Sequence, residues 1–438
     1  MPIMSKDEAQ QILKKVVSFS TADGCSATLN GNVGGNIRYA RNTVSTSGAN
    51  TNVSLVVQAN YGKQIATATI NEFDDASLKK VVKRAEELAK LAPENPEFMP
   101  NVEKQEYKPV KAFYESTAAA DPDYRAEAAF KSISAAKKKG LTAAGYLTDS
   151  QSFVAIANHN GNFGYHTSTD VNFSVTMRTE DGTGSGWSTR DFNDLALFDA
   201  QEASEIAIEK ALRSVEAKAI EPGKYTVILE PAASVGLLGN MAGAMDARQA
   251  DEGRSFMSKQ GGGNRIGEKV FDERVNIISD PWNTEIPGAP WTGENLPQQK
   301  VSWVKNGVVE NLAYSRYWAD KSKKSPVPGP NNVVMEGGSA STEEMIANTR
   351  RGILVTRTWY IRPVDPQTQL YTGLTRDGTF YIENGKIRYP IKNFRFNESP
   401  VIMLNNIEEL GKPVRINGSL IPTMKLRDFT FSSLSDAV

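Results

Sequence analysis

Few side chains in this sequence could hold a metal ion or act as a general base. The 438 residues include two histidines, His159 and His166, and one cysteine, Cys25. A zinc site normally takes three or more ligands from His, Cys, Asp and Glu. The histidines are seven residues apart, and an odd offset on one extended strand places side chains on opposite faces. Gly161 and Gly164 between them indicate a turn. We therefore expect surface or strand-packing histidines and not a metal site.

Charged side chains gather in one short run that follows a segment rich in glycine and alanine. The run consists of Asp246, Arg248, Asp251, Glu252 and Arg254. Two interpretations stay open. The run is either a solvated, salt-bridged surface, which is the usual role of alternating charges, or a rim that faces a substrate or a partner protein.

Three short motifs resemble catalytic signatures only in part. Ser134 and Lys137 have the spacing of a Ser–Lys nucleophile, but they lie inside a predicted basic helix without the companion motifs. Ser185 lies in a Gly-Thr-Gly-Ser-Gly segment, which is not a nucleophile elbow. The three glycines at 261–263 lack the spacing of a dinucleotide-binding loop. We expect one structural helix and two loops at these places.

A predicted strand and helix position the charged run. Residues 225–229, Tyr-Thr-Val-Ile-Leu, have the length and β-branched content of a buried strand, and a Glu-Pro pair ends it. Apolar residues then recur every three or four positions, which predicts one face of a short helix: Val235, Leu238, Ala242 and Met245. The high glycine and alanine content of this helix indicates that something packs close to it. The helix carries no residue able to do chemistry.

This stretch resembles the motif region of the TldD/PmbA (TldE) family, once described as modulators of DNA gyrase and regarded as peptidase subunits. In the TldD branch the helix reads Leu-Leu-His-Glu-x-x-Gly-His, and its two histidines bind zinc. The matching residues here, 237–244, read Leu-Leu-Gly-Asn-Met-Ala-Gly-Ala. Gly239 and Ala244 thus occupy the ligand positions. Asn240 occupies the general-base position, and an amide cannot deprotonate a zinc-bound water at neutral pH. The third family ligand is a cysteine, and Val414 lies at its place.

The resemblance covers nearly the whole chain and implies a non-catalytic subunit of the TldE/PmbA type, without a metal or cofactor of its own. A TldD-like catalytic chain would carry the zinc. The two chains would form a heterodimer that degrades or processes unfolded or extended peptides. In isolation a homodimer is also expected, because a surface made for a similar chain is often self-complementary. Two alternatives stay open: a metallopeptidase active by itself through an unconventional carboxylate site, and a regulator of DNA topology.

Composition and charge limit the other classes of function. A net charge of −1 argues against a nucleic-acid-binding protein, because phosphate contacts need a basic surface. The single cysteine cannot form an internal disulfide. The sequence shows no N-terminal apolar signal segment and no run of about 18 apolar residues. We therefore expect a cytoplasmic protein without a membrane partner.

The hydrophobic patterns predict an α+β protein. Its N-terminal region is a two-layer helix–β-meander–helix unit, and its C-terminal region is mainly β, with the motif helix embedded in it. The resemblance adds that the C-terminal domain is barrel-like. We expect an N-terminal α+β domain at 1–110, a central α+β region at 111–220 that packs with the first, and the β domain at 221–438.

Local signals place several elements within these regions. Ser5 and Glu8 form a capping box ahead of a helix that reaches about residue 19. Asn306-Gly307 and Asn384-Gly385 lie between alternating apolar segments and predict two hairpins. In the first domain we expect separate strands at 25–29, 36–44, 52–60 and 63–73, the last two joined by a turn at Tyr61-Gly62.

Overall fold

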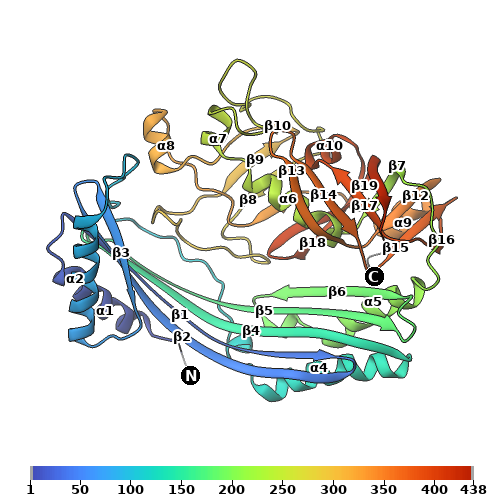
Figure 1. The fold of residues 1–438 in the computed structure, drawn as a ribbon, viewed down its shortest axis with the longest axis horizontal. Helices are drawn as coiled ribbons and strands as arrows, with labels where there is room; N and C mark the ends of the chain where they lie inside the picture. The colour runs from blue at the N-terminus through green and yellow to red at the C-terminus, as the bar shows by residue number, and fades with distance from the viewer. Residues whose placement is uncertain (1–2, 436–438) are drawn as a thin grey trace.

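A six-stranded antiparallel sheet organises the N-terminal half in the computed structural model, which describes residues 3–435. Its strand order is β3-β2-β1-β4-β5-β6, so strands from the first and second predicted domains form one continuous sheet (Figure 1). The strands are β1 (Gly24–Ala40), β2 (Thr43–Tyr61), β3 (Gln64–Ile70), β4 (Leu141–Asn158), β5 (Phe163–Thr179) and β6 (Ser185–Phe192).

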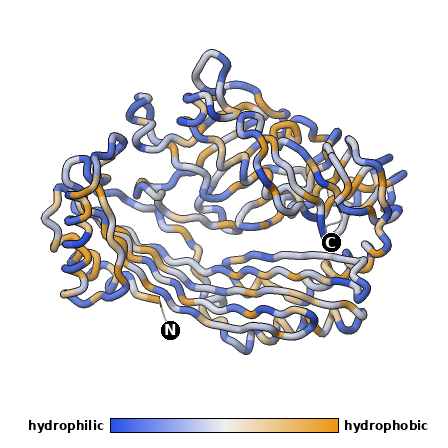
Figure 2. The backbone as a smooth tube through the Cα atoms, in the orientation of Figure 1, coloured by the Kyte–Doolittle hydropathy of each residue, from blue (hydrophilic) through white to orange (hydrophobic). Residues whose placement is uncertain are grey.

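Two helix pairs cover one face of this sheet, one pair at each end (Figure 1). Helix α1 begins at the predicted capping box of Ser5 and Glu8. Apolar residues of the strands pack against each pair and form two separate cores. Figure 2 shows hydrophobic residues along the strands beside α1 and α2. The pairs are α1 (Lys6–Phe19) with α2 (Asp75–Leu91), and α4 (Pro122–Lys138) with α5 (Ala200–Arg213); α3 (Glu115–Ala118) and the 3₁₀ helix η1 (Leu195–Leu197) are short connectors.

The N-terminal strands are longer than the sequence predicted. Residues 25–29 and 36–44 do not form two strands, because β1 runs unbroken through the glycines between them. These glycines are sites of close packing. A Cβ atom on Gly31 would collide with the Phe153 ring, and one on Gly35 would collide with the guanidinium of Arg125. The predicted hairpin is confirmed, but its two turn residues are Gly62 and Lys63, because Tyr61 still pairs with Gln64.

A branched sheet of thirteen mostly short strands organises the C-terminal half (Figure 1). Its main path runs β10-β9-β8-β11-β19-β7-β12-β15-β16, and β17, β14 and β13 branch from β19, which also pairs with β18. In residues 3–435 these pairings do not return to their starting strand, so the predicted barrel-like domain is an open mixed sheet. Both parallel and antiparallel neighbours occur, and the long β19 pairs with different strands along its length.

The bounds of the C-terminal strands are β7 (Gly223–Leu229), β8 (Ile277–Ser279), β9 (Val301–Lys305), β10 (Val308–Val309), β11 (Val333–Met335), β12 (Arg351–Val355), β13 (Thr358–Asp365), β14 (Leu370–Thr375), β15 (Thr379–Glu383), β16 (Lys386–Pro390), β17 (Phe394–Glu398), β18 (Ile407–Ile416) and β19 (Ser419–Leu434). The two hairpins predicted at Asn306-Gly307 and Asn384-Gly385 are confirmed as β9–β10 and β15–β16.

Among residues 3–435, five helices accompany this sheet. They are α6 (Pro231–Gly243), α7 (Ala247–Asp251), α8 (Arg316–Lys321), α9 (Thr342–Ala347) and α10 (Pro400–Asn405). The predicted motif helix is α6, and it follows β7 directly. In the described part of the chain no helix is both long enough and apolar enough to cross a membrane.

Candidate functional site

Helix α6 carries the motif positions, and the strand before it is buried at the end that leads into the helix. Strand β7 lies between β19 and β12, and its last three residues are inaccessible to solvent. Pro231 is the first residue of α6, where its fixed backbone angle and missing N–H suit a helix start. The helix packs one face against the core through Leu237, Leu238 and Met241. It also contacts β13, β18, β19 and α10.

The opposite face of α6 is open. Gly239, Asn240 and Gly243 are exposed, and a Cβ atom added at either glycine would meet no other described atom within 4 Å. The expectation that something packs close to this helix holds at Gly236, whose Cβ would lie 2.7 Å from Cδ1 of Ile361 on β13. It is wrong at Gly239 and Gly243. The small residues there leave a shallow, accessible helix face.

Ala244 lies just beyond the end of the helix. Its backbone N–H lies 3.1 Å from the carbonyl oxygens of both Asn240 and Met241. Gly239 and Ala244 are five residues apart, which on a continuous α-helix would turn their side chains about 140° away from each other. Because α6 ends at Gly243, the direction of the Ala244 side chain is set by the backbone beyond the helix.

Val414 lies on β18, one of the strands that α6 contacts. Its side chain is 46% exposed. The adjacent Arg415 donates from Nε to Oδ2 of Asp191 on β6, at 2.9 Å. Asp191 also accepts hydrogen bonds from the backbone N–H groups of Asn417 and Gly418, at 2.8 and 2.9 Å. One buried carboxylate thus fixes the tip of the β18–β19 hairpin to the N-terminal sheet.

Sequence reasoning missed Asp191. The residues around it in Ser-Thr-Arg-Asp-Phe form no recognisable motif. Its partners lie more than two hundred positions further along the chain, so no local signal could have found it.

The side chains at the motif positions do not fit a zinc ion. Gly239, Ala244 and Val414 offer no donor atom, and Asn240 offers only a neutral amide. Elsewhere in residues 3–435 no three His, Cys, Asp or Glu side chains come close enough together to bind a metal ion.

The two histidines belong to the N-terminal sheet and not to α6. His159 lies in the turn between β4 and β5, where its Nδ1 is 3.2 Å from the backbone N of Cys25 and 3.1 Å from Nδ2 of Asn101. The carbonyl oxygen of Cys25 lies 3.3 Å from the same Nδ1, so the tautomer of the ring sets which of these groups it pairs with. His166 lies edge-on to Trp291, with ring centroids 6.3 Å apart, and burial lowers the pKa of this imidazole. Both histidines hold loops against the sheet.

The predicted charged run forms a network of ion pairs around α7. Arg248 binds both carboxylate oxygens of Glu97 at 2.8 and 2.7 Å, and Glu97 lies in the connector after α2. Arg248 also binds Glu252 at 3.1 Å, and Glu252 pairs with Arg254. Arg248 therefore links the C-terminal half to the N-terminal half.

The remaining acidic residues of the run have structural partners as well. Asp246 caps α7 by accepting from the backbone N–H of Gln249 at 2.8 Å. Asp251 accepts from Asn264 at 2.7 Å and from the indole N–H of Trp318 at 2.8 Å. These contacts favour the salt-bridged surface. A role as a rim for a substrate or a partner stays a prediction.

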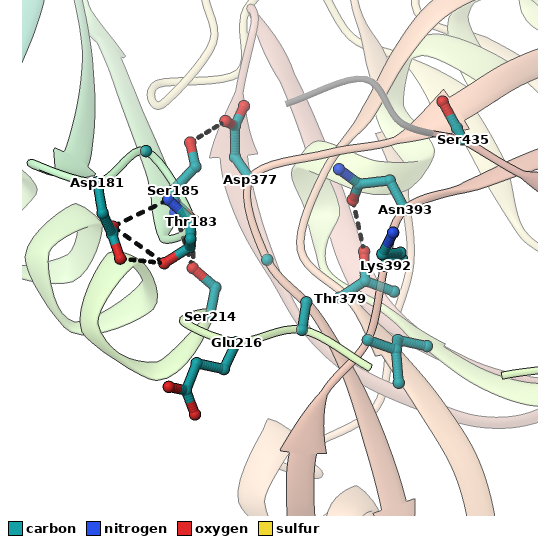
Figure 3. Close-up of a pocket in the computed structure, with 14 residues that line it drawn as sticks. Asp181, Thr183, Ser185, Ser214, Glu216, Asp377, Thr379, Lys392, Asn393 and Ser435 are labelled. Atoms are coloured by element: carbon teal, nitrogen blue, oxygen red, sulfur yellow. Dashed lines mark hydrogen bonds between the residues drawn. The ribbon is translucent and has the colours of Figure 1, made fainter. Parts of the chain in front are cut away.

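A pocket of about 350 Å³, lined by both polar and apolar groups, lies between the two halves of the molecule (Figure 3). The loop before β6 and the turn between β14 and β15 form two of its sides. Ser185 donates to Asp377 at 2.7 Å, and Asp377 also accepts from Arg357 at 2.6 Å. Because the guanidinium already balances the charge of Asp377, this arrangement joins the two sheets and does not form a nucleophile–base pair. The loop predicted here ends at Gly184, because Ser185 is the buried first residue of β6, and its contacts are structural.

Comparison with known protein families identifies the fold of this chain. Residues 222–433 match the PmbA/TldA metallopeptidase C-terminal domain, residues 102–215 match the central domain, and residues 27–89 match domain 1. The chain belongs to the PmbA/TldD metallopeptidase family. The three matches follow the same order as the domains in the family, and they cover most of the chain.

Curated relatives of this PmbA/TldD-family protein are distant. A metalloprotease from Methanothermobacter thermautotrophicus is 24% identical over 292 residues, which are 61% of this chain and 62% of that protein. The metalloprotease PmbA from a strain of Escherichia coli is 21% identical over 53% of this chain and 52% of its own length. The matched region thus spans between half and two thirds of these relatives.

Solved structures extend the likeness to nearly the full chain. TldE from Thermococcus kodakarensis has a TM-score of 0.85 at 17% identity, with 97% of this chain and 99% of that chain covered. A protein from Thermotoga maritima, described as a candidate modulator of a DNA gyrase, has a TM-score of 0.87 at 15% identity and is covered completely. At these identities the likeness establishes the shared fold.

Proposed function

We propose that this chain is the non-catalytic, TldE/PmbA-like subunit of a zinc metallopeptidase of the TldD/TldE type. The observation that carries the proposal is the open face of α6. It keeps the position and the accessibility of a motif helix, but its residues are Gly239, Asn240 and Ala244. Such a face can shape a substrate cavity, but it has no side chain that could activate a water molecule.

In this proposal a TldD-like chain supplies the zinc and the catalytic residues. The present chain contributes a cavity wall and stabilises the active chain in a cytoplasmic heterodimer that processes unfolded or extended peptides. The likeness to TldE over nearly the whole chain supports this assignment. So does the family membership, because it places the chain among metallopeptidase-related proteins.

Zinc content and peptidase activity test the proposal together. We expect the purified chain to bind no stoichiometric zinc and to leave casein intact. Co-expression with a TldD-like chain of the same organism should give a complex with zinc and with cleavage of casein. One zinc per chain together with activity of the isolated protein would refute the proposal and would favour the alternative, a peptidase that uses a carboxylate site.

The other alternative, regulation of DNA topology through direct DNA contact, has weaker support. The net charge of −1 gives no excess of positive charge to neutralise phosphates. A gel-shift titration at low salt checks this point, and we expect no retarded DNA.

A further inference from the structure

Strand β13 borders the open face of α6 and carries exposed aromatic side chains. Gly236 and Asn240 are four positions apart, so they lie on the same side of the helix. Ile361 of β13 lies against Gly236 and leaves Asn240 exposed. The two residues before Ile361 are Trp359 and Tyr360, which are 44% and 57% exposed. Two large aromatic rings therefore meet solvent beside the motif helix (Figure 1).

A bulge in β13 presents the Tyr360 ring. Between Trp359 and Arg362 the register against β14 shifts, so that two residues of β13 lie opposite a single residue of β14. Tyr360 has a φ of 54°, in the left-handed region that bulky residues rarely adopt. Backbone strain of this kind gathers at binding sites, and bulges turn side chains to new directions. Here Ile361 packs toward α6, and Tyr360 stays in solvent.

Arginine side chains hold the Trp359 ring in place. The guanidinium of Arg357 contacts two indoles, 4.0 Å from the ring centre of Trp187 on β6 and 4.8 Å from that of Trp359. Arg376 also lies over the Trp359 ring, at 5.5 Å. A ring that is fixed before a ligand arrives loses little conformational entropy on binding. Trp359 is therefore a preformed contact for an apolar or aromatic side chain.

Two exposed arginines lie on either side of Thr372, since β13 and β17 both pair with β14. Arg362 of β13 pairs in register with Thr372, and Nη1 of Arg395 on β17 lies 3.4 Å from the Thr372 hydroxyl oxygen. The Arg362 guanidinium stacks over the Tyr360 ring, 4.5 Å from its centre. A stacked guanidinium keeps its in-plane N–H groups available, and their fork matches the two oxygens of a carboxylate.

The charges around these arginines favour an acidic ligand. In residues 3–435 neither Arg362 nor Arg395 has an ion-pair partner. Asp365 is the carboxylate that follows on β13, and it accepts from the backbone N–H of Gln367 and from the Thr368 hydroxyl. A proline and the bulge interrupt β13, which favours recognition through side chains over the addition of another strand.

We propose that the aromatic–arginine face, formed by Trp359, Tyr360, Arg362 and Arg395, binds an extended peptide segment in which an aromatic side chain lies close to an Asp or Glu side chain. The aromatic side chain contacts Trp359 and Tyr360, and the carboxylate binds the two arginines. A peptide held in this way passes beside the open face of α6. This inference rests on the proposed function, because it gives the cavity wall a preference for acidic over basic substrates.

Peptide binding by the purified chain tests the proposal without zinc or cleavage. The probe is a short Gly-Ser peptide with one Phe and one Glu at alternate positions, and its two blocked ends leave the Glu side chain as the sole carboxylate. Calorimetric titration measures its affinity. We expect this peptide to bind at least about tenfold more tightly than the same peptide with Lys in place of Glu. Added NaCl should reduce the difference, because the arginines are exposed.

Three variants separate recognition from folding. Arg362→Glu should lower the affinity for the Glu peptide by at least about tenfold, and Arg362→Lys should lower it less, because an ammonium group lacks the planar fork. Arg84→Glu is the matched control, since Arg84 is exposed on α2 and the charge change is the same. Tyr360→Gly removes the ring and relieves the left-handed strain, so it should weaken binding without lowering the melting temperature.

Four results would overturn the proposal: no measurable binding of the Glu peptide, equal affinity for the Glu and Lys peptides, wild-type affinity of Arg362→Glu, or equally tight binding of an oligothymidine. Failure of the proposed function gives a different result. A complex with a TldD-like chain that cleaves casein without any of this peptide preference refutes the inference alone. Zinc and activity in the isolated chain refute the proposed function, and the peptide preference then still identifies the binding face.

Discussion

Replacement of Asp191 by alanine should loosen the contact between the two halves of the molecule. The carboxylate is 5% exposed and its partner Arg415 is 12% exposed, so both charges are shielded from water. Removal of one partner from a buried ion pair typically costs about 3 to 5 kcal/mol. Water can reach the hairpin tip, where Asn417 and Gly418 are exposed. We therefore expect the lower value, a loss of about 3 kcal/mol in the free energy of unfolding.

Urea unfolding measures this loss, with fluorescence followed at the first transition, because a chain of several domains need not unfold in two states. Asp191→Asn should lose about half as much, since a neutral acceptor makes weaker hydrogen bonds. Asp181→Ala is the control, because its hydrogen bonds to Thr179 and Thr183 stay within one loop. A double-mutant cycle with Arg415→Ala should show coupling. A loss below about 1 kcal/mol for Asp191→Ala, or no coupling, would refute this account.

Three further predictions follow from the packing. Gly31→Ala should lower the free energy of unfolding by about 1 to 3 kcal/mol through overpacking, whereas Gly239→Ala should raise it by about 0.5 to 1 kcal/mol; thermal melting compares them. Burial lowers the pKa of His166 below its ordinary value of 6.5. Below pH 6.5 the unfolded chain therefore binds more protons at this residue than the folded chain does. The free energy of unfolding should then fall as the pH is lowered, until the pKa of the folded state is reached. His166→Gln should flatten this decline in thermal melts at several pH values. Arg248→Ala should lower stability slightly at low salt and less at high salt, because its ion pairs are partly exposed; melts in increasing NaCl test this.

Local signals in the sequence predicted local structure well. The capping box at Ser5, the Asn-Gly turns and the apolar periodicity around Leu238 each involve residues within one turn or one helix. The interactions that stabilise these features join residues only a few positions apart, so they can be predicted without knowledge of the fold. The same holds for the motif helix, whose place after a buried strand was predicted from hydrophobicity alone.

Features that depend on distant residues could not be predicted in this way. Residues 25–29 and 36–44 were expected as separate strands, but Gly31 and Gly35 lie within one strand, where glycine allows close packing. This packing depends on Phe153 and Arg125, which lie about a hundred residues further along. Whether the C-terminal sheet closes into a barrel depends on which strands pair with β19. The sequence of β19 alone does not predict these neighbouring strands. The resemblance to the family supplied the degenerate motif, since residue spacing alone gave no reaction.

The central place of β19 has a consequence for how the protein is synthesised. This strand pairs with β7, β11, β17 and β18, yet it comprises residues 419–434. On the ribosome, β7 cannot pair with β19 until residues 230–418 have been translated. At about 5 to 20 residues per second this interval lasts roughly 10 to 40 s. During that time the apolar edge of β7 is exposed, so the nascent C-terminal half should depend on chaperones far more than the N-terminal sheet does.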